Sequence, residues 1–136
     1  VLQPEYNLYH RSAFEGALCD LCVSREIGVV TYYSLASGFL TGKYRQQSDL
    51  AQSQRGSGIG KYLNPRGLRI IDTLAEVAEQ NGAKPAEVAL AWLMTREGVT
   101  APIASATSIA QVESFARAAA LSISAEQLAR LDTASA

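Results

Sequence analysis

Short apolar runs alternate along the chain with stretches in which apolar residues recur at helical spacing. The runs at 1–8, 27–35 and 99–105 predict three strands. In the second run Val-Val-Thr-Tyr is continuous, which is typical of a sheet buried on both faces. We therefore expect helices to cover this sheet.

Helical spacing and capping residues predict the other elements. Ser12 and Glu15 form a capping box that predicts a helix over 12–26. Further helices are expected at 68–79, at 86–96, from Ser108 through Ala119, and from the Ser124 box onward, with Leu128 and Leu131 facing inward. The helix at 86–96 is apolar nearly all round, which predicts deep burial. The polar, glycine-bearing segment 45–66 predicts a long exposed loop.

Strands that alternate with helices predict a parallel sheet with right-handed crossovers, and hence an α/β fold. Three strands are few for such a fold, because a closed (β/α)8 barrel takes about 250 residues. The sequence also begins inside a strand, at Val1. We therefore expect the C-terminal part of a larger domain, in which other residues cover the edge of the first strand.

Composition excludes several classes of partner. The 136 residues are 48% hydrophobic, carry a net charge of −1, and have a pI of about 5.8. Such a balance predicts neither nucleic acid nor an acidic membrane surface as a partner. No apolar run reaches the roughly 18 residues that span a bilayer, and the first residues lack the pattern of a signal peptide. A cytoplasmic location is the expectation.

Two cysteines form the element Cys19-Asp-Leu-Cys22, which is compatible with a redox site or half of a zinc site. Zinc takes about four ligands, and His10 is the only histidine. The alternative is that both thiols belong to the packed face of the first helix, and the helical spacing of the neighbouring apolar residues favours it. His10 is then a turn or surface residue.

The carboxyl ends of parallel strands are where ligands bind in α/β folds, and here they select the regions 3–7, 32–42 and 105–111. An aromatic residue at a strand end offers a flat face to a planar ring, and the small residues after it allow a ligand to approach the backbone. Lys43 adds charge for a phosphate, and the turn before the helix at Ser108 predicts an anion site. The alternatives are that the tyrosines are ordinary strand residues, that Gln111 only caps its helix, and that Gln3 satisfies a neighbouring backbone group.

Three motifs in this order, QPEYNLYHR, YYSLASGFLTGKY and APIASATSIAQVE, resemble the C-terminal half of the aldo/keto reductases. The resemblance covers essentially the whole chain and is greatest to bacterial members with a long loop, whose second motif is shared with potassium-channel β subunits. It implies a (β/α)8 TIM barrel of which residues 1–136 are the cofactor-binding portion, strands six to eight with flanking helices. It also implies an NADP(H)-dependent oxidoreductase that reduces the aldehyde or ketone group of a small-molecule carbonyl substrate to an alcohol.

By motif position, the resemblance implies that Gln3 binds the nicotinamide carboxamide and that Tyr32 stacks on the nicotinamide. The residues expected beneath the pyrophosphate are Tyr33, Ser34, Leu35, Ala36, Ser37, Gly38 and Leu40, with Lys43 as their basic end. Those expected around the adenosine and its 2′-phosphate are Ser105, Thr107 and Gln111. The chain departs from the family at Thr107, where members often carry Arg, Lys or Ser, which leaves the preference between NADP and NAD open. It also departs at Ser114 and Phe115, which replace an adenine-contacting Glu and Asn.

The catalytic Asp, Tyr, Lys and His of the family lie on the first four strands, and no residue here matches them. The chain alone is therefore expected to be inactive. Two other hypotheses remain: a non-catalytic NADP(H)-binding module like the channel β subunits, and a half-barrel that self-associates through its open edge. The cations Arg55, Lys61 and Arg66 of the long loop are candidates for reaching toward the cofactor phosphates.

Overall fold

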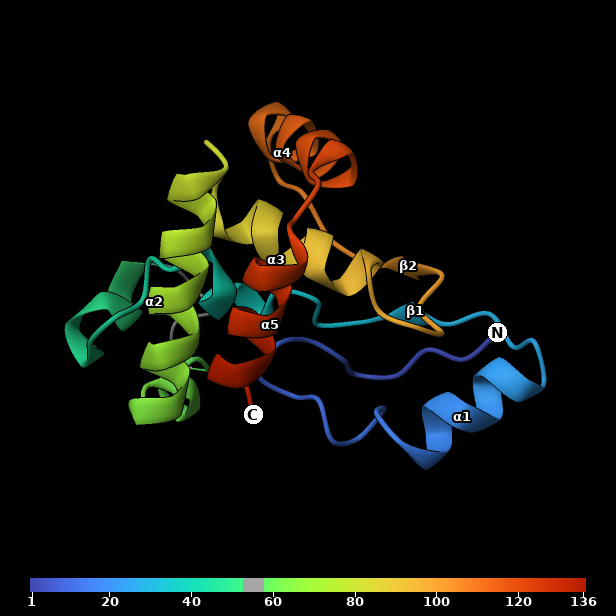
Figure 1. Ribbon diagram of the computed structural model, residues 1–136. Helices are drawn as coiled ribbons and strands as arrows, with labels where there is room; N and C mark the ends of the chain where they lie inside the picture. The colour runs from blue at the N-terminus through green and yellow to red at the C-terminus, as the bar shows by residue number, and fades with distance from the viewer. Residues whose placement is uncertain (53–57) are drawn as a thin grey trace.

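The computed structural model describes residues 1–52 and 58–136 (Figure 1). In chain order, the elements are α1 (Ala17–Ser24), β1 (Val30–Thr31), the 3-10 helices η1 (Ala36–Thr41), η2 (Gln47–Gln52) and η4 (Gly60–Tyr62), α2 (Pro65–Gln80), α3 (Pro85–Met94), β2 (Ala101–Pro102), α4 (Ile109–Ala120) and α5 (Ala125–Ala134). The predicted alternation of helices and strands is therefore present, with additional short helices.

The three predicted strand segments lie parallel to one another. β1 pairs with β2, with Val30 opposite Ala101, and the N-terminal segment joins β1 through two isolated bridges, Leu2 to Val29 and Glu5 to Tyr32. The regular strands are much shorter than predicted. Pro4 and Pro102 lack the N–H that a ladder requires, which limits regular pairing in the two outer segments.

The two faces of this small sheet differ because side chains alternate along a strand. Tyr6, Val29 and Thr31 are buried on the face that the helices cover. Tyr32 and Ile103, which alternate with them, remain exposed on the other face. One face of the sheet is thus packed, and the other carries apolar side chains at the surface.

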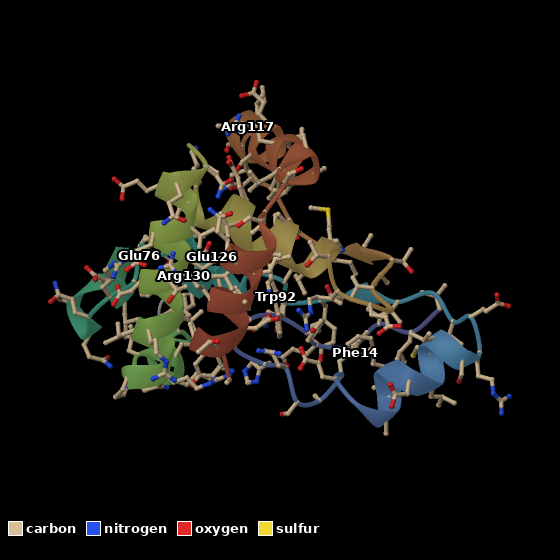
Figure 2. All side chains as sticks on the ribbon, viewed as in Figure 1. Phe14, Glu76, Trp92, Arg117, Glu126 and Arg130 are labelled. Carbon is tan, nitrogen blue, oxygen red and sulfur yellow. The ribbon has the colours of Figure 1, made fainter. Side chains whose placement is uncertain are left out.

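Helix α3 is the centre of the helical layer, as its apolar sequence predicts. It packs on α2, on α4 and on β2, and Trp92 and Leu93 are fully buried. Figure 2 shows the Trp92 side chain close to α5, where its indole N–H donates to Asp132 Oδ1 at 2.8 Å. The stripe of α2 that contains Ile71 and Leu74 is also buried, as predicted.

The predicted start of the first helix is wrong. Residues 12–16 form turns, and α1 begins only after Gly16, whose φ is 91°. Glu15 does not complete a capping box. Its carboxylate instead accepts hydrogen bonds from the Tyr6 hydroxyl at 2.6 Å and from Arg11 Nε at 2.9 Å. A tertiary contact has therefore overridden the local capping signal.

Of the two further capping boxes that the sequence predicts, Ser124 with Gln127 is complete, and Ser108 with Gln111 forms only in part. Ser124 Oγ accepts from the N–H of Gln127, whose side chain accepts from the N–H of Ser124, so α5 begins with a complete capping box. Ser108 Oγ accepts from the N–H of Gln111 at 3.3 Å. The side chain of Gln111 does not complete this second box, because its Oε1 accepts from the N–H of Thr107 at 2.6 Å.

The prediction of an exposed loop over 45–66 is wrong in part. The segment forms η2 and η4, and both Ile59 and Tyr62 are fully buried. The Tyr62 ring stacks on Phe39, with ring centroids 5.2 Å apart. Single buried apolar or aromatic residues in a polar segment produce no periodic pattern, so the sequence alone does not predict their burial.

The cysteines lie where the packed-helix alternative placed them. Cys22 is buried in the core, and the half-buried Cys19 donates to the carbonyl oxygen of Glu97 at 3.4 Å. Among residues 1–52 and 58–136, no group of three or more His, Cys, Asp or Glu side chains is arranged to hold a metal ion. In the same residues, no helix has the length and apolar character to cross a bilayer.

A buried carboxylate joins α3 to α4. Glu87 accepts hydrogen bonds from Ser114 Oγ at 2.8 Å and from Arg117 Nε at 2.9 Å, and its other oxygen accepts from the N–H of Lys84 at 3.2 Å. Figure 2 shows Arg117 on α4, above the end of α2. Burial acts to raise the pKa of Glu87, but these three hydrogen bonds outweigh it and hold the pKa below its ordinary value of 4.5.

We predict that Glu87→Gln lowers the free energy of unfolding by about 2 kcal/mol at pH 7, since hydrogen bonds to a charged group are the strong ones. Because the folded-state pKa is depressed, this contribution is complete above pH 4.5 and is lost as the pH falls through the folded-state pKa. Urea unfolding at several pH values measures it. The control Glu113→Gln, on the exposed side of α4, should change stability by less than about 0.5 kcal/mol. The prediction is wrong if the difference in free energy of unfolding between wild type and Glu87→Gln stays the same as the pH is lowered.

Candidate functional site

The carboxyl ends of the three parallel segments meet at one edge of the sheet, which we call the rim. The N–H of Ile103 donates to Thr31 O at 2.8 Å, and the N–H of Tyr32 donates to Pro4 O at 3.0 Å. Because all three segments run in the same direction, the regions that follow Glu5, Tyr32 and Ile103 leave the sheet on the same side. The structure thus brings the three predicted ligand-binding regions to one edge.

Gln3 lies on the N-terminal segment, one residue after the Leu2 to Val29 bridge, and it is exposed. Glu5, two residues further on, bridges Tyr32, so both glutamine and glutamate lie on the same side of the segment. Gln3 is therefore on the sheet face that also carries Tyr32. No hydrogen bond of its side chain within the described residues is observed.

Two tyrosines stand at the end of β1. Tyr32 is 37% exposed and Tyr33 is 56% exposed, and their rings meet edge to face with centroids 5.1 Å apart. Tyr33 has a φ of 51°, in the left-handed region that side chains other than glycine seldom adopt. The rim therefore presents two large aromatic faces on a strained turn.

The segment after the tyrosines is held partly in the core. Ser34 is buried, and its hydroxyl donates to Thr31 O at 3.1 Å. Ala36 and Leu40 are fully buried, which leaves Leu35, Ser37 and Gly38 as the half-exposed part of the segment. Ala36, Ser37 and Gly38 all have positive φ, at 49°, 59° and 99°. The buried members anchor the turn that the exposed members form.

Lys43 is exposed just beyond this turn, and its Nζ lies 5.0 Å from the centroid of the Tyr44 ring. A cation at this distance over an aromatic face is weakly attracted to it, by about 0.5–1 kcal/mol at an exposed site. The lysine is thus oriented by Tyr44, yet its ammonium remains available to solvent or to an anion.

The third region, 105–111, is exposed throughout and leads into α4. Gln111 Oε1 accepts hydrogen bonds from the N–H of Thr107 at 2.6 Å and from Thr107 Oγ1 at 3.2 Å. The sequence from 103 to 113 has no Lys or Arg, and its only charged residue is Glu113. Attraction for an anion at this end of α4 therefore depends on free backbone N–H groups and the helix dipole.

Of the three loop cations, the structure contradicts the prediction for Arg66. Arg66 donates to Ser135 O at 2.7 Å, to Tyr9 O at 2.9 Å and to Ala136 O at 3.2 Å, so it binds the end of α5 and does not reach the rim. A guanidinium at a helix C-terminus satisfies carbonyl groups that lack helical partners and interacts favourably with the helix dipole. Lys61 Nζ lies 5.0 Å over the Tyr62 ring. Arg55 lies outside the described residues.

Asn7, which no sequence motif marks as a site residue, lies directly behind the rim. Asn7 is fully buried, and its Nδ2 donates to Tyr33 O at 2.9 Å. Its Oδ1 accepts from the N–H of Tyr9 at 2.8 Å and from the N–H of His10 at 2.9 Å. The available signal was its position near the end of the strand predicted at 1–8, since asparagine often binds the backbone of a turn.

Ser114 belongs to the core. Its hydroxyl donates to the buried Glu87, so it faces α3 and not the surface beyond the rim. Phe115, beside it, is half-buried. The Ser114 hydroxyl is bound to Glu87, and the Phe115 side chain has no polar group. Neither residue therefore supplies the hydrogen bonds of the Glu and Asn that the resemblance implies at these positions.

A concavity lies at the end of α5. It has a volume of about 550 Å³ and is lined by Tyr9, His10, Arg11, Ser12, Glu15, Arg66, Asp132, Ser135 and Ala136. Its guanidinium groups already have partners, since Arg11 donates to Glu15 and to Asp132 O and Arg66 binds three carbonyl groups. His10 Nε2 lies 3.6 Å from Glu5 Oε1. The guanidinium groups of this hollow are therefore already bound to protein oxygens and are not free to hold an anion.

Comparison with known proteins identifies the class of protein to which this parallel α/β sheet belongs. A profile of the aldo/keto reductase family matches residues 1–136, and the chain belongs to that family. It is 33% identical over 137 residues to an L-glyceraldehyde 3-phosphate reductase of Escherichia coli O157:H7, which covers 96% of this chain and 40% of that protein. It is also 33% identical over 118 residues to a probable voltage-gated potassium channel β subunit of Arabidopsis thaliana, covering 83% of this chain and 36% of that protein.

A solved structure shows the same fold. The chain superposes on a crystal structure of a thermostable aldo-keto reductase in complex with the inhibitor epalrestat, with a TM-score of 0.70 and 22% sequence identity. The match covers 97% of this chain and 38% of that chain. The chain thus has the TIM-barrel type of fold of this family, and it spans about two fifths of the length of the relatives it matches.

We predict that Arg66→Ala lowers the free energy of unfolding by about 1–2 kcal/mol, because it removes the hydrogen bonds that cap three carbonyl groups. The affinity for NADPH should stay within about twofold, since Arg66 does not face the rim. Urea unfolding and a fluorescence titration measure the two quantities. The control Arg25→Ala, exposed at the end of α1, should leave both within error. A large loss of affinity with unchanged stability would restore the predicted phosphate contact.

Proposed function

We propose that residues 1–136 are the C-terminal, cofactor-binding portion of a barrel enzyme, with strands that correspond to six, seven and eight of the (β/α)8 fold. The enzyme would be an NADP(H)-dependent oxidoreductase that reduces aldehyde or ketone groups of small molecules to alcohols. Membership of the family, the parallel order of the three segments and the share of each relative that the chain covers all support this assignment.

The observation that carries the proposal is the exposed Tyr32 ring at the point where three parallel strands end. A flat aromatic face of this kind stacks on a planar ring such as nicotinamide. The turn that follows has positive φ at Ala36, Ser37 and Gly38, and Ser37 and Gly38 are accessible, so a diphosphate can approach the main chain there. These features fit an extended dinucleotide that lies along the rim.

The proposed roles follow the order of the rim. Gln3 would bind the carboxamide of the nicotinamide, and Tyr32 would hold its ring. Tyr33, Leu35, Ser37, Gly38 and Lys43 would contact the pyrophosphate, while Ser34, Ala36 and Leu40 would act by anchoring the turn in the core. Ser105, Thr107 and Gln111 would lie beside the adenosine, where backbone N–H groups supply most of the attraction for anions.

The chemistry also needs a proton donor at the carbonyl oxygen. The cofactor, when bound, supplies the hydride. In this chain the rim residues would hold and orient the two reacting partners, which accounts for a large part of the acceleration that enzymes achieve. We infer that the proton donor comes from a segment that precedes Val1 in a longer protein, so residues 1–136 alone would be inactive.

The exposed face and the unpaired edges of the small sheet support the proposal that a further part of the barrel packs against them. Val1 and Ile103, on the outer segments, are 96% and 39% exposed. Unpaired strand edges next to exposed apolar side chains favour association with further strands. We propose that the N-terminal part of the same barrel covers them. Self-association of a half-barrel is the alternative, and sedimentation separates the two: the proposal requires a monomeric barrel of about 250 residues or more.

A second candidate is a regulatory module that binds NADP(H) without turnover. Its support is the similarity to probable potassium channel β subunits of Arabidopsis thaliana and of Oryza sativa subsp. japonica, which is 33% and 34% identity. Both candidates require the dinucleotide to bind at the rim. They differ in turnover, because only the enzyme consumes NADPH when a carbonyl compound is added.

The experiment is to titrate the full-length protein with NADPH and NADH and then to add 4-nitrobenzaldehyde or methylglyoxal. Binding of NADPH followed by its oxidation supports the reductase. Binding without oxidation over a broad panel of carbonyl compounds supports the regulatory module. Absence of binding by either dinucleotide overturns both, and tighter binding of NADH would replace NADP(H) as the proposed cofactor.

We predict that Tyr32→Ala raises the Kd for NADPH about fivefold to tenfold, because it removes an aromatic stacking interaction. Tyr32→Phe keeps the ring and should leave the Kd within about twofold. NADPH fluorescence measures both values. Since Tyr32 is partly exposed, neither variant should unfold, and circular dichroism checks this. Equal Kd values for Tyr32→Ala and wild type would exclude stacking at this residue.

A further inference from the structure

Asn7 is the polar side chain that ties the end of the first segment to the turn after β1. It is fully buried, and it makes three hydrogen bonds with backbone groups: Tyr33 O at 2.9 Å and the N–H groups of Tyr9 and His10 at 2.8 and 2.9 Å. The regular pairing of the two segments stops just before this point, at the contact between Tyr6 N and Tyr32 O. The Asn7 amide therefore continues the connection between the segments where the ladder ends.

The orientation of the Asn7 amide follows from its partners. Two of them, the N–H groups of Tyr9 and His10, are donors and require the oxygen, whereas Tyr33 O is an acceptor and requires the NH₂ group. An ionised aspartate has the same shape but no donor, and alanine has neither function. Only an amide satisfies the donor and both acceptor contacts at this site without a change of shape.

The carbonyl that Asn7 holds belongs to a strained residue. Tyr33 has a φ of 51°, a conformation that costs about 1 kcal/mol or more for a residue with a side chain. Its carbonyl oxygen also accepts from the N–H of Ala36 at 2.8 Å, which closes the turn. Asn7 and Ala36 thus converge on one oxygen and together keep the turn in a conformation that it would otherwise leave.

We propose that Asn7 is a positioning residue for dinucleotide binding, which sets the rim by holding the Tyr33 carbonyl and, through it, the Tyr32 ring and the turn at 35–38. The inference rests on the proposed function, since it concerns the same rim. It adds a residue that would not touch the cofactor, because Asn7 has no exposed surface. The rim is then pre-formed, and little ordering is required when the ligand binds.

The test is Asn7→Asp in the full-length protein. The variant retains the two acceptor contacts and replaces the donor by a negative charge that faces Tyr33 O. We expect the Kd for NADPH to rise about tenfold, comparable to the loss of one buried hydrogen bond. NADPH titration also yields the number of binding sites per protein. A residue that only supports folding would lower the number of sites and leave the Kd of the remaining sites unchanged, whereas a positioning residue raises the Kd at a full complement of sites.

Asn81→Asp is the matched control. Asn81 Nδ2 also donates to a backbone carbonyl, Val77 O at 2.8 Å, but it lies at the C-terminus of α2, which has no part in the rim. We expect this variant to lower the melting temperature and to leave the Kd for NADPH within about twofold. The pair therefore separates loss of an amide donor in general from loss of the donor at the rim.

A further arm uses pH. Protonation of the aspartate in Asn7→Asp restores an O–H donor toward Tyr33 O, so the ratio of its Kd to that of the wild type should fall when the titration is repeated in mild acid. A Kd for Asn7→Asp equal to that of the wild type at neutral pH, or a reduced number of sites with unchanged Kd, overturns the positioning role. If wild type itself does not bind NADPH or NADH, it is the proposed function that fails.

Discussion

The parallel pairing of three short segments is the constraint on which the other features depend. Only a few backbone hydrogen bonds form it, yet they direct the chain after Glu5, after Tyr32 and after Ile103 to the same edge. The segments that follow Glu5 and Ile103, about 100 positions apart in the sequence, thereby leave the sheet at one rim. Helix α3 makes the pairing stable, because its buried side chains cover one face of the sheet and contact α2 and α4 as well.

The last helix is held by positive charge at its C-terminus. Arg11, Arg66 and Arg69 donate to the carbonyl oxygens of Asp132, of Ser135 and of Ala134, respectively. Guanidinium groups placed here satisfy carbonyls that lack helical partners and oppose the negative end of the helix dipole. The cations are consequently committed to structure. The rim is poor in positive side chains, so the phosphate binding that we propose there would rely on Lys43 and on backbone N–H groups.

The rim itself combines exposed side chains with buried support. Tyr32 and Tyr33 project from a turn in which Tyr33, Ala36 and Ser37 have positive φ. Such backbone persists only where its surroundings determine it, and strain of this kind occurs often at ligand sites. Here the surroundings are the buried Ala36 and the Asn7 amide, which the core holds in place. The tyrosine rings are thus accessible while the turn that carries them is held by buried contacts, which is the combination that a preorganised binding site requires.

The sequence by itself determined the kinds of element and the family. Local signals were sufficient for the Ser124 box, for the buried stripe of α2 and for the all-round apolar α3, since propensity and periodicity act over neighbouring residues. The parallel direction of the strands also followed from the alternation of strands with helices along the sequence. Only the tertiary structure decided the fate of polar residues with distant partners. Glu15 accepts from the Tyr6 hydroxyl and does not cap its helix, Arg66 binds the end of α5, and Asn7 binds Tyr33 O. Hydrogen-bond partners far apart in sequence leave no periodic trace, because burial by the whole fold selects them.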